Sequence, residues 1–253
     1  MKDSSYEDKI VAFIDILGFT SLVMSINTHP EVHDRLLYAL KLIKSRKAPE
    51  LSDFTDYQIE VSVFSDSIAL STNCDNLWGI IWSCGSLQAE ILKVGVLTRG
   101  GISKGKTFHE DDILYGEGMI NAYRIESKAA IYPRIVLDPK LIPGLNEGLR
   151  YYSLRQDSDS LWFINPFSFN AIIDDTDELT ADGYDPHELY LKELGDHIDK
   201  GKAEAKTVDQ VSKWTWLKRI YMDERRDYLK THETKMDKLF KALSPEKGNR
   251  TIS

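Results

Sequence analysis

Short apolar runs alternate with longer amphipathic stretches over the first two thirds of the chain. Residues 10–14 form a continuous apolar run, which is typical of a strand buried on both faces. Residues 30–48 carry apolar side chains at helical spacing, so this stretch is predicted to be a helix with one face on the core. The same reasoning predicts two strands within 58–72, further strands at 94–102, 134–138 and 160–164, and helices at 75–91 and 116–130.

The predicted order is strand, helix, two strands, helix, strand, helix, strand. Ser65 and Asp66 supply the tight turn between the two consecutive strands, and Asp75 is predicted to cap the helix that follows them. This order favours an α+β fold in which helices flank a mixed central sheet.

The pattern changes in the last third of the chain, which is charged and helical. A segment rich in Asp, Glu, Gly and Pro at 176–187 marks the boundary, so we expect a domain of residues 1–173 and a helical extension of residues 174–253. The favoured interpretation is that the extension covers the sheet or contacts a second subunit. The alternative is a docking surface for another protein. Helices are predicted at 188–194 and 208–243.

The composition is that of an ordinary globular protein with a negative charge. The 253 residues are 42% hydrophobic and include 32 basic and 40 acidic side chains, a formal net charge of −8. This balance excludes a disordered chain and argues against binding nucleic acid over the whole surface. The two cysteines lack metal-ligand spacing, the N-terminus lacks an apolar signal core, and no apolar run suits a membrane. We therefore expect a cytoplasmic protein with neither a nucleic-acid nor a membrane partner.

Two aspartates adjoin apolar strands, where an ionised carboxylate is costly unless other groups compensate its charge. Asp15 directly follows the buried run, and Asp66 lies in the turn of the predicted hairpin. Each can be explained by hydrogen bonds to the backbone of its own turn. If the first strand lies beside the hairpin, however, the two carboxylates converge at one end of the sheet. Their mutual repulsion would then favour a divalent cation between them, and oxygen ligands suit Mg²⁺ or Mn²⁺.

Two further segments carry polar residues that could contact an anion. The segment 99–105 combines Arg99 with glycines that would let backbone N–H groups approach a phosphate. Arg124 lies in the predicted helix at 116–130, where the simpler interpretation is a surface pair with a nearby glutamate. The acidic segment 109–112 has no second histidine at ligand spacing and is predicted to be a solvated loop.

Taken in order, the segments 13–20, 61–70, 99–105 and 115–126 resemble the class III nucleotidyl cyclases over about residues 9–138. The resemblance implies that family's ferredoxin-like mixed sheet and a homodimer with composite active sites. It implies two Mn²⁺ or Mg²⁺ ions per site, held by Asp15, the carbonyl of Ile16 and Asp66. For the nucleoside triphosphate it implies Gly18, Phe19, Thr20, Arg99 and Tyr123 as binding residues, with Arg99 and Arg124 as the catalytic arginines and Arg124 supplied across the dimer interface.

The position that reads the base departs from the family's pattern. Ser62 stands where the family has a purine-reading lysine, and the partner aspartate falls near Ile113, one residue from Asp112. A Lys/Asp pair recognises the edges of adenine by placing a donor and an acceptor, so its loss argues against an adenylate cyclase. The base must then be read in another way.

A more specific resemblance points to pyrimidine nucleotides. The family's transition-state asparagine aligns with Ile120 and not with Asn121, and Tyr123 replaces a small residue. The sequence Ala-Tyr-x-x-Glu at 122–126 and the segment 132–136 look like the bacterial Pycsar cyclases, antiphage enzymes that make cyclic UMP or cyclic CMP. This resemblance implies a uridylate cyclase that converts UTP to 3′,5′-cyclic UMP and diphosphate. The alternatives are a cytidylate cyclase, a nucleotide sensor without catalysis, and an adaptor that acts through its C-terminal helix.

Overall fold

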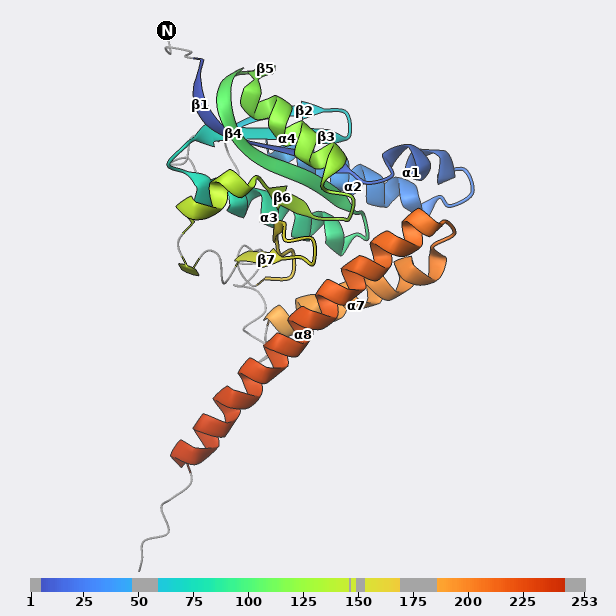
Figure 1. Ribbon diagram of the computed structural model, residues 1–253. Helices are drawn as coiled ribbons and strands as arrows, with labels where there is room; N and C mark the ends of the chain where they lie inside the picture. Colours follow the sequence, from blue (N-terminus) through green and yellow to red (C-terminus); the bar gives the residue numbers. More distant parts are fainter. Residues whose placement is uncertain (1–5, 47–58, 146, 149–152, 169–185, 244–253) are drawn as a thin grey trace, which may run out of the picture.

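A mixed sheet forms the centre of the protein (Figure 1). The computed structural model describes residues 6–46, 59–145, 147–148, 153–168 and 186–243, and only the helical backbone of 231–243. The strand order is β2-β3-β1-β4-β6-β8-β7, and β5 pairs with β4. The strands are β1 (Glu7–Ile16), β2 (Glu60–Phe64), β3 (Ser67–Asn73), β4 (Thr98–Glu110), β5 (Ile113–Gly116), β6 (Ile135–Leu137), β7 (Leu154–Gln156) and β8 (Trp162–Ile164).

Helices flank this sheet, which confirms the predicted α+β class with a mixed central sheet. Strands β4 and β6 run parallel, whereas β1 runs antiparallel to both of its neighbours, β3 and β4. The helices are α1 (Phe19–Ser25), α2 (Glu31–Ser45), α3 (Leu77–Lys93), α4 (Glu117–Lys128), the 3₁₀ helix η3 (Pro139–Gly144), α7 (Pro186–Glu204) and α8 (Val208–Leu243).

The central strand β1 is buried on both faces, as its apolar run predicts. Ile10 and Ile14 belong to the large cluster shared with α2 and α3, whereas Val11 and Phe13 belong to a smaller cluster that α4 covers. Successive side chains of a strand point to opposite faces, so one strand can supply both clusters. Its polar end, at Asp15, therefore lies at the rim of a well-packed sheet.

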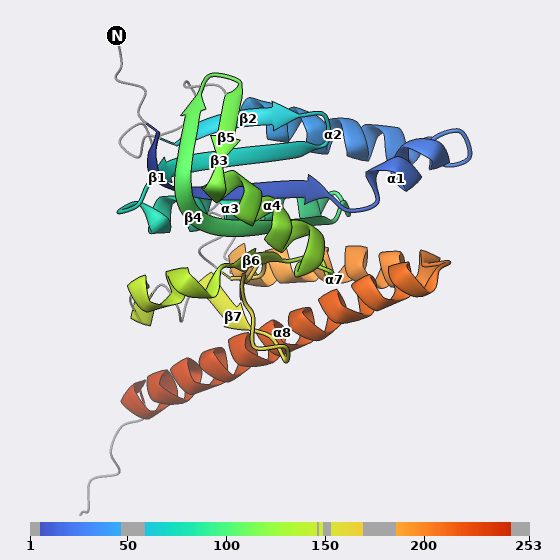
Figure 2. The ribbon, with the colours of Figure 1, turned by 45° about the horizontal axis from the view of Figure 1, so that its top comes forward.

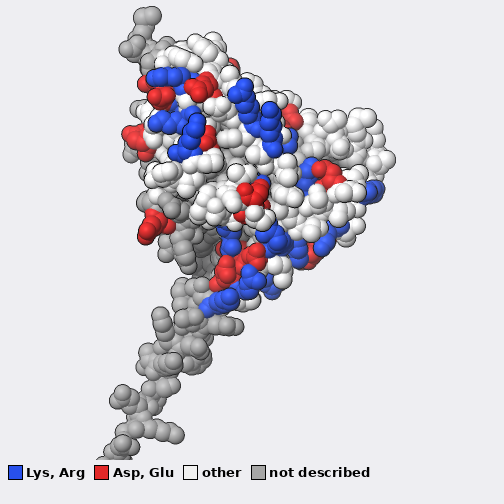
Figure 3. Space-filling view, viewed as in Figure 1, with Lys and Arg blue, Asp and Glu red and all other residues white. Residues whose placement is uncertain are grey.

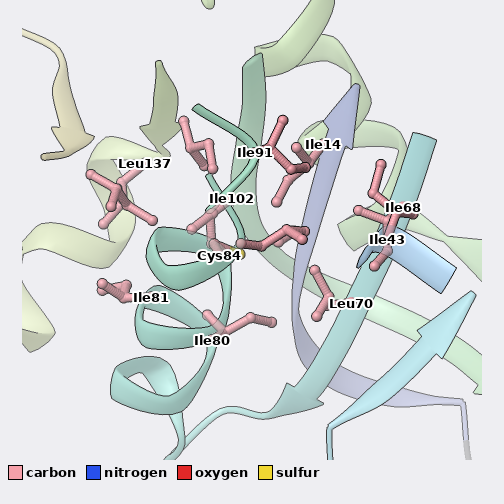
Figure 4. Close-up of a cluster of buried hydrophobic side chains, with 14 of the residues drawn as sticks. Ile14, Ile43, Ile68, Leu70, Ile80, Ile81, Cys84, Ile91, Ile102 and Leu137 are labelled. Carbon is pink, nitrogen blue, oxygen red and sulfur yellow. The ribbon is translucent and has the colours of Figure 1, made fainter. Parts of the chain in front are cut away.

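Helix α3 packs on one face of the sheet through an apolar stripe. Figure 4 shows Ile80 and Cys84 of this helix directed toward Ile68 and Leu70 of β3 and toward Ile14 of β1. Each fully buried side chain of this size contributes roughly 1.5–3 kcal/mol to folding. This cluster therefore fixes β1 and β3 as neighbours, which is the condition for the two aspartates to meet.

The cap of α3 differs by one residue from the prediction. The helix begins at Leu77 and its N-cap is Asn76, whose side-chain oxygen accepts a hydrogen bond from Gly79 N at 3.1 Å. Asp75 lies one residue too early to reach that N–H group and is exposed. Asparagine and aspartate are nearly equal as caps, so the sequence alone could not choose between two adjacent candidates.

Strand β4 differs more from its prediction. It begins at Thr98 instead of residue 94 and ends at Glu110, so it includes the first two residues of the segment 109–112, for which the sequence predicts a loop. Only Asp111 and Asp112 form the predicted exposed turn, which joins β4 to β5. Glycine, lysine and histidine lower the strand propensity of this stretch, and pairing with β1 along ten residues overrides it. The short strands β5 and β7 and the short helix α1 were also not predicted.

Helices α7 and α8 lie side by side as a hairpin against the sheet domain (Figure 2). They share a buried cluster with β6, β8 and α3, to which Leu194, Leu217 and Ile220 contribute from the hairpin. The predicted helix at 188–194 is part of the longer α7. The predicted boundary at 176–187 lies almost entirely outside the described residues, so the division at residue 173 stays a prediction.

The surface carries interspersed charges. Lysine and arginine side chains alternate with aspartate and glutamate over the face shown in Figure 3. None of the helices in the described part of the chain combines the length and the apolar character that crossing a membrane requires.

Candidate active site

The structure brings Asp15 and Asp66 to the same end of the sheet. Asp15 lies at the end of β1 opposite Ser67, the first residue of β3, and Asp66 lies in the turn before it. The backbone N–H of Ile16 donates to the Asp66 carbonyl at 3.2 Å, which ties the end of β1 to that turn. The hairpin therefore lies beside the first strand, as the convergence of the two carboxylates requires.

The turn that carries Asp66 has an unusual backbone conformation. Ser65 adopts a φ of +51°, a left-handed conformation that glycine takes at less cost than other residues. A two-residue hairpin turn commonly needs this conformation because it matches the twist of the paired strands. Ser65 is thus a residue under mild strain that holds Asp66 at the tip of the hairpin.

The environment of Asp15 disfavours its negative charge. Partial burial is the largest cause, and the nearby Asp66 carboxylate adds repulsion, so the pKa of Asp15 is raised above its ordinary value. Two contacts act in the opposite direction. Ser67 Oγ donates to Asp15 Oδ1 at 3.0 Å, and Arg99 Nη2 lies 4.0 Å from Asp15 Oδ2. A cation at this end of the sheet would stabilise the anionic form further.

The donor set fits a magnesium- or manganese-type ion. Asp15 and Asp66 offer carboxylate oxygens, and hard divalent cations prefer oxygen ligands. Among the described residues there is no group of three or more His, Cys, Asp or Glu side chains placed to hold a metal by themselves. Mg²⁺ typically uses one or two carboxylates and completes its octahedron with water and substrate phosphates. Two aspartates are therefore sufficient for an ion that is shared with a phosphate ligand.

Arg99 is held by Glu126, a residue of α4 for which the sequence predicts no role at the site. Arg99 lies opposite Asp15 on β4, and its Nε is 2.6 Å from Oε1 of Glu126 on α4. This contact is an ion pair without hydrogen-bond geometry, because neither atom has a hydrogen-bond partner. Glu126 is only 2% exposed, and burial raises its pKa against the opposing effect of the Arg99 charge. Arg99 thus faces two carboxylates, those of Asp15 and Glu126.

Helix α4 reaches β4 this closely because of a glycine. A Cβ atom on Gly101 would lie 2.3 Å from the carbonyl oxygen of Ala122 and 2.9 Å from the backbone nitrogen of Glu126. The bare backbone at this position therefore lets Glu126 meet Arg99. The Gly100 N–H donates to the carbonyl of Arg134 at 3.1 Å and is therefore not free to bind an anion, while the phosphate contact expected of the 99–105 segment as a whole stays a prediction.

Two further residues expected at the site, Tyr123 and Arg124, lie on α4. Tyr123 is 52% exposed and contacts Phe13 edge to face, with 5.6 Å between ring centroids. Arg124 is exposed, and its guanidinium makes no ion pair within the described part of the chain. The expected surface pair of Arg124 with a glutamate is therefore not formed within the described residues.

The segment after Asp15 forms a helix start. Gly18 adopts a φ of +73° as the N-cap of α1, and the helix begins at Phe19. Phe19 packs partly against the main core, whereas Gly18 and Thr20 are exposed. Only Leu17 separates these three residues from Asp15 and Ile16 along the chain.

The position expected to read a base is occupied by a buried hydrogen-bond network. Ser62 is fully buried, and its hydroxyl lies 2.8 Å from His109 Nε2 and donates to the Asp111 carbonyl at 3.1 Å. Ser71 Oγ lies 2.7 Å from the other ring nitrogen of His109. Through His109, this network connects the end of β4 to β2 and to β3. A lone histidine among carboxylates gave no signal of such a network in the sequence.

Comparisons with known proteins yield only distant structural similarity. No protein-family model and no curated protein matches this chain. A bacterial light-regulated adenylyl cyclase is 18% identical with a TM-score of 0.44, over 64% of this chain and 92% of that one. Another structure of a bacterial light-regulated adenylyl cyclase is 14% identical with a TM-score of 0.41, over 74% of this chain and 57% of that one. The guanylyl cyclase Cya2 is 12% identical with a TM-score of 0.36, over 63% of this chain and 92% of that one. The function proposed below therefore rests on the residues of the site.

Proposed function

We propose that this protein is a metal-dependent nucleotidyl cyclase that converts UTP to 3′,5′-cyclic UMP and diphosphate. The observation that carries the proposal is the meeting of Asp15 and Asp66 at one end of adjacent strands, with Arg99 opposite Asp15. Two carboxylates suit divalent ions that bind a triphosphate, and an arginine beside them suits its negatively charged leaving group. The order of these residues along the chain also resembles the class III cyclases.

In the proposed reaction the ribose 3′-oxygen forms a bond to the α-phosphorus. The bond between the α-phosphorus and the bridging oxygen breaks, diphosphate leaves, and the 3′-hydroxyl proton passes to water. Bound Mg²⁺ or Mn²⁺ would supply charge neutralisation and a lowered pKa for the 3′-hydroxyl. Asp15, Asp66 and the Ile16 carbonyl would hold the two ions, while Arg99 would stabilise the charge that develops on the diphosphate.

We further propose that two copies of the chain build each site. Arg124 is exposed on α4 without an ion pair in the described structure, and large apolar side chains are exposed near it. Ile120 and Tyr123 lie on the same helix, and Ile113 and Tyr115 lie on β5, each at least half exposed. A second copy that covers this apolar surface would bring its own Arg124 and Tyr123 toward the nucleotide, beside the Gly18–Phe19–Thr20 segment.

The choice of uracil rests on the absence of the purine-reading pair. Ser62 is buried against His109 and carries no charge, so the lysine that would read adenine has no substitute at this position. By the resemblance to the Pycsar cyclases, the product would be a second messenger in antiphage defence that activates a separate effector. Cytosine is the alternative base, since both pyrimidines fit the same argument.

The test is to incubate the purified protein with an equimolar mixture of ATP, GTP, CTP and UTP and Mn²⁺, and to identify products by chromatography. The proposal predicts cyclic UMP and diphosphate in equal amounts. Cyclic AMP as the main product would contradict the base assignment, and cyclic CMP would favour the alternative. Tight triphosphate binding without any cyclic product would favour a nucleotide sensor.

The shared site has its own test. If Asp66 and Arg124 of one site belong to different chains, a mixture of the inactive variants Asp66→Ala and Arg124→Ala regains activity through hybrid dimers, each with one intact site. Failure to regain activity after subunit exchange, verified with differently tagged chains, would place the whole site within one chain.

A further inference from the structure

A buried polar network joins helix α8 to the strand that carries Arg99. We propose that Trp216 and Asp157 are positioning residues for Arg99, so that the α7–α8 hairpin is a working part of the candidate active site and not an appendage. The consequence for catalysis rests on the proposed function, whereas the mechanical coupling between α8 and β4 does not.

The centre of the network is a fully buried arginine. Arg134, just before β6, is 0% exposed and donates from Nη1 to Asp157 Oδ2 at 2.7 Å. Its guanidinium also pairs with Asp159 and donates to the Ala129 carbonyl at 3.2 Å. A buried charge is tolerated only when its partners stay in place, because removal of one partner leaves the other uncompensated. Arg134 and Asp157 therefore hold each other in fixed positions.

Helix α8 supplies two of the four residues that donate hydrogen bonds to Asp157. Trp216 donates from Nε1 to Asp157 Oδ2, and Arg219 donates from Nη2 to Oδ1, both at 2.6 Å. These donors, together with the backbone N–H of Ser158, lower the pKa of Asp157 despite its burial. Asp157 is thus anionic and binds the helix on one side and Arg134 on the other.

Aromatic packing fixes the orientation of Trp216. Its indole stacks on Tyr132 with 5.4 Å between ring centroids and an interplanar angle of 4°, and it meets Phe163 of β8 edge to face. The Arg134 guanidinium lies 5.5 Å from the centroid of Tyr132 and 5.9 Å from that of Trp216. Tyr132 and Arg134 belong to the segment that enters β6. Any displacement of α8 therefore acts directly on that segment.

Two backbone connections carry this arrangement to the site. The carbonyl of Arg134 accepts the Gly100 N–H at 3.1 Å, and Gly100 follows Arg99. The N–H of Leu17 donates to the Leu97 carbonyl at 2.8 Å, and both leucines pack in the cluster that the α7–α8 hairpin shares. Leu17 lies two residues beyond Asp15, and Leu97 lies two residues before Arg99. The hairpin thus supports the ends of both strands that carry the site.

Amide hydrogen exchange on the full-length protein tests the coupling without any assay of activity. We expect Trp216→Phe, which keeps an aromatic ring and removes the Nε1 donor, to increase the exchange rate of the Gly100 amide by about tenfold or more, since hydrogen bonds to charged groups are the stronger ones. Arg219→Ala is the milder variant, because Arg219 is half exposed and Asp157 keeps its other partners. Arg219→Ala should also increase the exchange rate of the Gly100 amide, so the coupling can be tested even if Trp216→Phe does not fold.

The matched control is Arg225→Ala, an exposed arginine of the same helix with no contact to Asp157. It should leave the Gly100 amide unchanged. The proposal is contradicted if Trp216→Phe and Arg219→Ala accelerate exchange within α8 but leave Gly100 at its wild-type rate. That result would make the hairpin an appendage, whatever reaction the protein catalyses.

A double-mutant cycle then tests the catalytic consequence. If Trp216 acts through Arg99, Trp216→Phe lowers the rate of cyclic nucleotide formation in the wild type by about tenfold but has little effect in an Arg99→Ala background. A general loss of stability would instead lower both rates by the same factor, which would contradict a positioning role. Absence of cyclase activity in the wild type would refute the proposed function and leave the exchange experiment decisive for the coupling.

Discussion

Asp15 and Arg99 face each other across the antiparallel pair of β1 and β4, with 4.0 Å between the Asp15 Oδ2 and Arg99 Nη2 atoms. On the other side of β1, Ser67 faces the same aspartate and donates a hydrogen bond to it. One strand end is therefore flanked by a cation and by a hydroxyl group, with Asp66 in the adjoining turn. The antiparallel pairing of β1 with both neighbours produces this arrangement from three segments far apart in the sequence.

The first prediction concerns stability in the absence of metal. Because burial, and after it repulsion by Asp66, raises the pKa of Asp15, the folded protein keeps this proton to a higher pH than the unfolded chain does. The contribution of Asp15 to stability is thus most favourable at low pH and declines as the pH rises through the folded-state pKa. Asp15→Asn should raise the Tm at pH 7.5 in the presence of a chelator, and by less at pH 4.

The control for this measurement is Asp75→Asn, which removes an exposed carboxylate and should leave Tm unchanged at both pH values. Added Mn²⁺ should raise the Tm of the wild type and not that of Asp15→Asn. An equal response of both proteins to Mn²⁺ would show that Asp15 is not a ligand.

The second prediction concerns the carboxylate that holds Arg99. Glu126→Gln keeps the shape of the side chain and removes the charge that lies 2.6 Å from Arg99 Nε, so Arg99 is less well placed for the triphosphate. We expect kcat/KM for cyclisation to fall by about tenfold, since small losses of alignment at a reacting centre have effects of this order or larger.

Glu117→Gln, on the exposed first turn of the same helix, is the matched control and should keep wild-type kcat/KM. Glu126→Asp should restore part of the loss by returning the charge. Wild-type kinetics in Glu126→Gln would mean that Arg99 does not depend on Glu126 for its position.

The third prediction concerns the close approach of α4 to β4. Gly101→Ala places a Cβ atom 2.3 Å from the Ala122 carbonyl oxygen and 2.7 Å from the Ile125 Cβ atom, so helix and strand must separate. Overpacking of this kind costs about 1–3 kcal/mol in the free energy of unfolding. Urea unfolding measures the loss as a lower midpoint.

Gly144→Ala is the comparison for this variant, because a Cβ atom at Gly144 meets no atom within 4 Å. Its midpoint should stay close to that of the wild type. Identical midpoints for the two variants would indicate that α4 does not lie against β4 as closely as described.

The sequence predicts the local elements that carry the site but not the contacts between them. Continuous apolar runs identify β1 and the β2–β3 hairpin, helical periodicity identifies α3, and a glycine-rich turn marks the start of α4. The meeting of Asp15 and Asp66 could be stated only as a condition, because periodicity does not say which strands are neighbours. The structure meets that condition by pairing β1 with β3.

The contacts that the sequence did not reveal join residues far apart along the chain, or they depend on residues whose type does not favour a strand. Glu126 reaches Arg99 only because Gly101 lets the helix approach, and a glycine in a strand carries no signal of what packs on it. His109 appeared solvated among acidic residues, yet the long strand β4 carries it to Ser62 and Ser71. The link between Trp216 and Asp157 spans 59 residues of sequence and leaves no periodic trace.

The most direct test of the central claim is the rate of cyclic UMP formation from UTP and Mn²⁺ by wild type, Asp66→Asn and the control Asp75→Asn. If Asp66 holds a metal at the reacting phosphate, its substitution lowers the rate by roughly 10²–10³, the typical loss for one group that stabilises developing charge. Asp75→Asn should match the wild type. Equal rates for wild type and Asp66→Asn would contradict the account.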